Sequence, residues 1–75
     1  MSKEIVPVKI TTEFIKLDSL LKFSGMTETG GEAKEIVLQG LVRVNDEICT
    51  MRGKKVHPGD RVQVENYEIV VQHGG

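Results

Sequence analysis

The stretch GGEAKEIVLQGLVRVND, residues 30–46, decides the fold of this chain. Small or apolar side chains recur in its first half at helical spacing, at Ala33, Ile36, Val37 and Gly40. This spacing predicts a short helix with one buried face, which ends at Gly40 in a left-handed turn. Alternation follows over residues 41–44, and Asn45-Asp46 has the composition of a hairpin turn. The stretch therefore predicts a helix that leads directly into a β-hairpin.

The residues before this stretch predict an edge strand and a first short helix. Residues 5–10 are rich in β-branched side chains, but Pro7 restricts them to an edge strand or an extended lead-in. Apolar residues at helical spacing follow, at Leu17, Leu20 and Leu21. They predict a helix with Asp18 as its N-cap and an end near Ser24-Gly25. Thr29 is a candidate N-cap for the second helix.

The residues after the hairpin turn predict further strands. The expected elements are a returning strand at 47–49, a turn at 58–60, a strand at 61–64, a turn at 65–66 and a last strand at 67–71. The expected fold class is α+β, with two short helices packed on a small, mostly antiparallel, curled sheet. We expect a single domain over residues 1–75, with loose termini at 1–4 and 73–75.

Composition favours a non-catalytic domain in the cytoplasm. The chain has 75 residues, of which 39% are hydrophobic and 28% charged, as in ordinary soluble domains. A single cysteine, Cys49, excludes an internal disulfide framework and fits a reducing compartment. No apolar run is long enough to span a bilayer, and no signal peptide is recognised. His57 and His73 lack zinc-ligand spacing, so we expect no metal, no cofactor and no catalytic residues.

The distribution of charge says more than the formal net charge of −1, which by itself does not favour a nucleic-acid ligand. Residues 48–59 contain no acidic side chain but hold Arg52, Lys54, Lys55 and His57. This segment is either a solvated loop or a phosphate-facing loop in which each cation adds counterion release. Gly30-Gly31 likewise either permit a tight turn against the first helix or let a phosphate approach helical N–H groups.

Three motifs in order resemble the S4 RNA-binding domain. They are KLDSLL at 16–21, TGGEAK at 29–34 and GLVRVN at 40–45. That family has an Arg-Leu-Asp opening to its first helix, a Ser/Thr-Arg-Ser-x-Ala-Arg opening to its second, and Gly-x-Val-x-Val-Asn after it. VHPGDRV at 56–62 also resembles the family's Val-x-x-Gly-Asp-x-Val closing strand. The glycine pair and RGKK at 52–55 are similar to those of small stand-alone bacterial S4-like proteins.

The resemblance implies an S4-like fold (the αL motif) that binds structured RNA, of the ribosomal or transfer type, in ribosome assembly or RNA metabolism. It implies ribosomal or RNA-processing proteins as further partners, and neither a membrane nor a small-molecule substrate. The implied binding surface is a basic helix-turn-helix with the hairpin beside it. The implied RNA-binding residues are Lys16, Lys22, Gly30, Gly31, Lys34, Arg52, Lys54 and Lys55. Gly30 replaces an arginine of the family pattern, and Lys16 and Lys34 replace arginines with point charges.

The end of the chain supports an alternative function. Gly74-Gly75 follows a predicted strand and resembles the tail of β-grasp sulfur carriers, whose C-terminal diglycine carries an activated carboxylate. An adenylate or thiocarboxylate at Gly75 would identify such a carrier. A third interpretation keeps the S4 fold as a protein-docking module without direct RNA contact.

Overall fold

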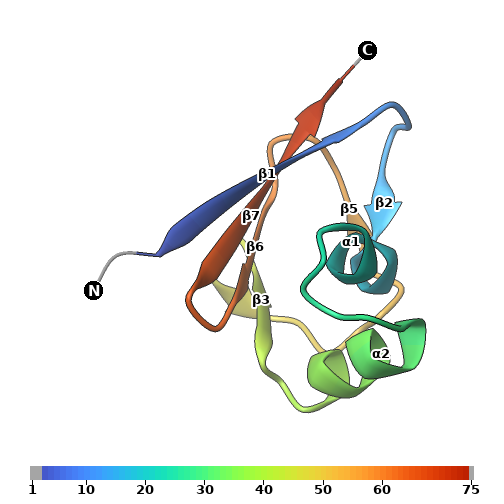
Figure 1. Ribbon diagram of the computed structural model, residues 1–75, viewed down its shortest axis with the longest axis vertical. Helices are drawn as coiled ribbons and strands as arrows, with labels where there is room; N and C mark the ends of the chain where they lie inside the picture. Colours follow the sequence, from blue (N-terminus) through green and yellow to red (C-terminus); the bar gives the residue numbers. More distant parts are fainter. Residues whose placement is uncertain (1–2, 75) are drawn as a thin grey trace.

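The computed structural model describes residues 3–74. In chain order these residues form β1 (Glu4–Ile10), β2 (Ile15–Lys16), α1 (Leu17–Phe23), α2 (Gly30–Leu38), β3 (Val42–Val44), β4 (Glu47–Ile48), β5 (Lys55–Val56), β6 (Arg61–Val64) and β7 (Tyr67–His73). The two helices lie together beside the larger sheet, and β2 and β5 lie side by side at the start of α1 (Figure 1).

The larger sheet has five strands in the order β1-β7-β6-β3-β4. Only the β1–β7 pair is parallel among its strand pairs, so the predicted α+β class with a mostly antiparallel sheet is confirmed. The β3–β4 hairpin turns at Asn45 and Asp46, whose φ angles are 52° and 71°. Two consecutive left-handed residues define the turn that suits a two-residue hairpin, as the sequence predicts.

Pro7 lies on the edge strand β1, where its missing N–H does no damage to the sheet. The N–H of Glu4 donates to the Asn66 carbonyl oxygen at 2.8 Å. Alternate residues of a strand direct their N–H groups to the same side. The N–H groups of Val6, Val8 and Ile10 therefore point to β7, as that of Glu4 does. Pro7 therefore occupies an outward position, and its ring leaves the free edge a poor template for another strand.

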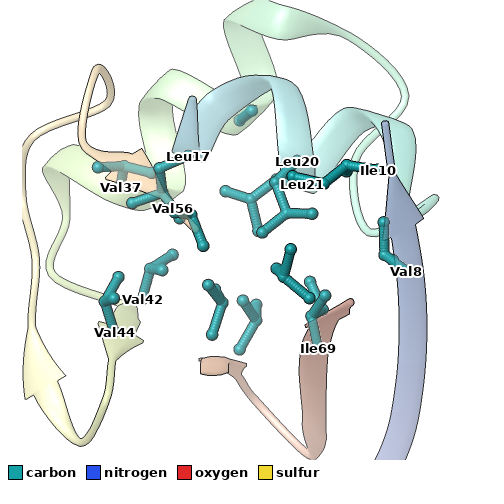
Figure 2. Close-up of a cluster of buried hydrophobic side chains, with 14 residues drawn as sticks. Val8, Ile10, Leu17, Leu20, Leu21, Val37, Val42, Val44, Val56 and Ile69 are labelled. Atoms are coloured by element: carbon teal, nitrogen blue, oxygen red, sulfur yellow. The ribbon is translucent and has the colours of Figure 1, made fainter. Parts of the chain in front are cut away.

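The helices cover one face of the five-stranded sheet and close an apolar core. Its members are Val8, Ile10, Leu17, Leu20, Leu21, Ala33, Val37, Val42, Val44, Val56, Val62, Val64, Ile69 and Val71. Side chains of the helices and strands point towards one another across this interior (Figure 2). The predicted helical stripe of α1 is confirmed, because Leu17, Leu20 and Leu21 are all 0% exposed. Ile36 is half-buried and packs at the margin of the core.

Both helix ends follow the predicted glycine chemistry, but the start of α1 does not follow the prediction. Gly25 and Gly40 have φ angles of 85° and 75° directly after the helices. Asp18 is not an N-cap: Lys16 occupies that position without a side-chain cap, and the Asp18 carboxylate accepts a hydrogen bond from the Ser19 N–H. Backbone carbonyls from far along the chain take the place of a side-chain cap, as described below.

The ends of the described chain are more ordered than the sequence predicts. Glu4 and His73, expected in loose termini, lie in the paired strands β1 and β7. The Gly74 N–H donates to the Ile10 carbonyl oxygen at 2.9 Å. This pairing gives no support to the free tail that a sulfur carrier needs, and Gly75 lies outside the described residues.

Gly40→Ala tests how strongly the helix-to-hairpin joint depends on its left-handed glycine. An added Cβ would meet Ile48 Cγ2 at 3.7 Å, an ordinary contact, so the strain comes from φ alone. We expect urea denaturation to give a loss of about 1–2 kcal/mol in the free energy of unfolding. Gly53→Ala is the matched control, because its Cβ meets nothing within 4 Å and no positive φ is involved. Equal effects of both substitutions would contradict this account.

Candidate nucleic-acid interface

The pairing of β2 with β5 brings cations from two distant segments together. Lys16 stands directly opposite Lys55 in this antiparallel pair. The Leu17 N–H donates to the Lys54 carbonyl oxygen at 2.9 Å, and the Asp18 N–H donates to the Arg52 carbonyl oxygen at 3.1 Å. These bonds satisfy two of the N–H groups that the start of a helix leaves without partners. We call Lys16, Arg52, Lys54 and Lys55 the basic cluster.

The basic cluster lacks neutralising partners. Within residues 3–74 the ion pairs are His57–Asp60 and Arg61–Asp46, and neither involves the cluster. All its side chains are exposed to solvent. Like charges directly opposite each other in a strand pair are destabilising, so the Lys16–Lys55 pair does not serve the stability of the sheet. The cluster is instead suited to an external anion.

Aromatic side chains flank the cluster. The Lys55 Nζ lies 4.9 Å from the centroid of the Phe14 ring, a cation–π distance that orients the ammonium group. The Phe14 and His57 ring centroids are 6.0 Å apart, with their planes at 52°. Phe14 is half-buried, so it ties Lys55 and His57 to the body of the domain.

Asp60 holds the turn after β5 against the β3–β4 hairpin. Its carboxylate accepts hydrogen bonds from the His57 N–H at 2.8 Å and from Asn45 Nδ2 at 3.1 Å. Asn45 Oδ1 in turn accepts from the Arg61 N–H at 3.0 Å. Burial alone raises the pKa of Asp60, but these hydrogen bonds and the charges of His57 and Lys54 outweigh it and lower the pKa below the usual 3.8.

The helical candidates lie apart from the basic cluster. Lys22 is exposed in the last turn of α1, and Lys34 is exposed on α2. The helical period places Lys34 on one flank of α2 with Gly31, and Glu32 on the opposite flank. Within the described residues, no hydrogen bond or ion pair connects either lysine with the basic cluster.

Gly30 and Gly31 open α2 without being required by packing. A Cβ at Gly30 would meet nothing within 4 Å, and one at Gly31 would meet only Thr29 Oγ1 at 3.9 Å. Neither glycine has a positive φ, so neither a left-handed turn nor close packing requires glycine at these positions. Thr29 is the N-cap, as predicted, and its hydroxyl accepts from the Glu32 N–H at 3.1 Å. The N–H groups of the two glycines have no acceptor within the helix.

A groove of about 600 Å³ separates the β3–β4 hairpin from residues 52–57, which we call the basic segment. Its lining includes Asn45, Ile48, Met51, Lys54, Lys55 and His57. The sequence did not predict this groove, although the exposed apolar residues Ile48 and Met51 stand directly before the basic segment. Cys49 is half-buried there and packs against the core.

The lengths of the helices and the placement of the titratable side chains in residues 3–74 bear on membrane and metal binding. No helix within them is long and apolar enough to cross a membrane. Across residues 3–74, no group of three or more His, Cys, Asp or Glu side chains is placed to hold a metal ion.

Asp60→Ala tests the anchoring role of the carboxylate. Because the folded pKa is lowered, Asp60 adds stability that is fully present above the unfolded pKa, near 3.8, and is lost as the pH falls through the folded pKa. At pH 7 we expect the variant to lose about 1–2 kcal/mol in the free energy of unfolding. The difference from the parent chain shrinks below about pH 3.8. Glu47→Ala, an exposed carboxylate on β4, is the control, and a pH-independent loss at Asp60 would contradict the assignment.

Comparison with known proteins agrees with this architecture. The family model of the S4 domain matches residues 8–72. The Probable ribosome maturation protein RlbA of Bacillus subtilis (strain 168) is 39% identical over 61 residues, which cover 81% of this chain and 86% of that protein. The matched region contains both helices and the whole β3–β4 hairpin. This chain therefore belongs to the S4 domain family.

Proposed function

We propose that this chain binds structured ribosomal RNA and acts in ribosome maturation, without a catalytic step. The observation that carries the proposal is the basic cluster, in which Lys16, Arg52, Lys54 and Lys55 come together with no carboxylate ion-pair partner among residues 3–74. Membership of the S4 domain family and similarity to a ribosome maturation protein support RNA as the polyanion.

Binding begins with contacts between the cluster and phosphates. Lysine ammonium groups act as point charges and release counterions, so they give affinity without reading bases. The two backbone hydrogen bonds to the start of α1 hold this segment before RNA arrives, which lowers the ordering cost of binding. The surface therefore recognises the spacing of phosphates in a folded RNA.

Helix α2 adds a second contact in this proposal. Lys34 and the N–H groups of Gly30 and Gly31 face solvent at or near its start, where the helix dipole favours an anion. Lys22, exposed in the last turn of α1, is a separate cation that could contact a further phosphate. Two contact regions on one rigid domain fix the orientation of the RNA better than either alone.

Lys54→Gln combined with Lys55→Gln tests the basic cluster. At about 1 kcal/mol for each lost phosphate contact, we expect the Kd for a ribosomal RNA hairpin to rise about 30-fold at low salt. The slope of log K against log salt should fall in magnitude by about 1.4–1.8. Lys3→Gln with Lys9→Gln, on the exposed side of the β1 region, is the matched control. Binding unaltered by the cluster variant, measured by fluorescence anisotropy, would remove the proposed surface.

Lys34→Gln tests the contribution of α2 separately. Loss of one phosphate contact should raise the Kd about fivefold, at about 1 kcal/mol. Glu32→Gln is the control, since this position lies on the opposite flank of α2 and glutamine keeps the favoured capping-box chemistry. If the two variants bind the hairpin equally, α2 does not face the RNA. Transfer RNA serves as a competitor, and stronger binding of it would redirect the proposal.

A further inference from the structure

We propose that the groove between the β3–β4 hairpin and the basic segment holds an unpaired nucleotide of the bound RNA. This inference rests on the proposed function and specifies its ligand, a folded RNA with a bulged or looped-out base. The base would lie in the groove while the adjoining phosphate contacts Lys54 and Lys55. Sequence-specific reading of RNA generally uses such unstacked bases, because the major groove of an RNA helix is too narrow for side chains.

The size of the groove suits this ligand. Its volume of about 600 Å³ lies within the range of sites for small organic molecules. The groove is formed by segments that are fixed from both sides. The Asp60 carboxylate links Asn45 of the hairpin to His57. The bond from the Leu17 N–H to the Lys54 carbonyl oxygen fixes the segment on the other side.

The lining of the groove mixes polar side chains with two large apolar ones. Ile48 is 61% exposed and Met51 is 63% exposed, although both are large hydrophobic side chains. Both line the groove, next to the half-buried Cys49. Apolar side chains that remain exposed in one hollow indicate a ligand with an apolar surface. The flat faces of a nucleobase present such a surface.

His57 supplies an aromatic wall. Its imidazole is one of the side-chain rings on which unpaired bases stack. Two neighbours position the ring. The Phe14 ring centroid lies 6.0 Å from the His57 ring centroid, and Asp60 Oδ2 lies 3.8 Å from His57 Nδ1. It lines the groove and is held in position before a ligand arrives.

The charges around the groove select an anionic occupant. Lys54 and Lys55 stand on its wall without ion-pair partners within the described residues. Asp60 also lines the groove, but its carboxylate is engaged by the His57 N–H and the Asn45 amide. Glu47 of β4 lines the groove on the hairpin side, so the anionic part of a ligand is expected on the Lys54 and Lys55 side. Two exposed apolar side chains, Ile48 and Met51, beside the ammonium groups of Lys54 and Lys55 fit a base with its phosphate better than a protein side chain.

Two RNA hairpins with the same stem, one of them with a single-nucleotide bulge, test this inference. We expect the full chain to bind the bulged hairpin about tenfold more tightly, the scale of one base stacked on an aromatic ring. Ile48→Ser with Met51→Ser should abolish the preference and leave binding of the unbulged hairpin unchanged. Both residues are more than half exposed, so the fold should tolerate the change. Ile5→Ser with Phe23→Ser, equally exposed elsewhere, should keep the preference.

Photocrosslinking locates the base directly. A bulged 4-thiouridine should crosslink to a peptide within residues 47–57. Equal affinity for both hairpins, with the lysine variants still weakening binding, would overturn the groove assignment and leave the proposed function standing. So would crosslinks confined to the sheet face around Arg43 or Gln63, as expected if the groove instead takes a protein. Failure to bind either hairpin at low salt would overturn the proposed function itself.

Discussion

The start of α1 is the constraint on which the site depends. A helix leaves its first N–H groups without partners, and here the carbonyl oxygens of Arg52 and Lys54 accept from Leu17 and Asp18. The antiparallel pairing of β2 with β5 continues this contact directly before the start of the helix. The acceptors are backbone atoms of the basic segment. The same hydrogen bonds therefore cap the helix and position the cations. Moving the basic segment away would expose the helix end.

This arrangement separates stability from function within a small domain. Stability comes from the apolar core, where α1 contributes Leu17, Leu20 and Leu21 at 0% exposure. The surface of the same helix start carries Lys16 opposite Lys55, an unfavourable pair for the isolated protein. The stability that the core provides offsets this repulsion, and a bound RNA phosphate would reduce the repulsion. The side chains best placed for binding are thus among those that contribute least to folding.

Much of the fold follows from local signals in the sequence. The left-handed Gly40, the turn at Asn45-Asp46 and the cap at Thr29 each act over a few residues, and each was predicted. The cap at Asp18 was predicted by the same reasoning and was wrong, because distant carbonyls supply the acceptors. Strand β5 has only two residues and forms through its pairing with β2, so no periodicity could reveal it.

The candidate site was predictable in composition but not in shape. The cations of residues 52–55 stand out as an acid-free run, whereas their contact with Lys16 depends on the non-local strand pair. The groove depends further on Asp60 linking His57 and Asn45, two residues from separate turns. Hydrogen bonds between turns leave no repeat in the sequence. A motif can therefore identify the phosphate-binding side chains, while the hollow beside them has to be found in three dimensions.

The formal net charge of −1 does not oppose RNA binding in this arrangement. At physiological ionic strength, exposed charges are screened beyond about 8 Å, so a phosphate responds mainly to the side chains nearest to it. Near the basic cluster these include three lysines and an arginine. Of the nearby carboxylates, Asp18 accepts from the Ser19 N–H, Asp60 accepts from His57 and Asn45, and Glu47 lies on the hairpin side of the groove. Few phosphate contacts on a small domain give modest, salt-sensitive affinity. Discrimination among folded RNAs then has to come from shape, and the groove is the feature beside the cluster that can supply it.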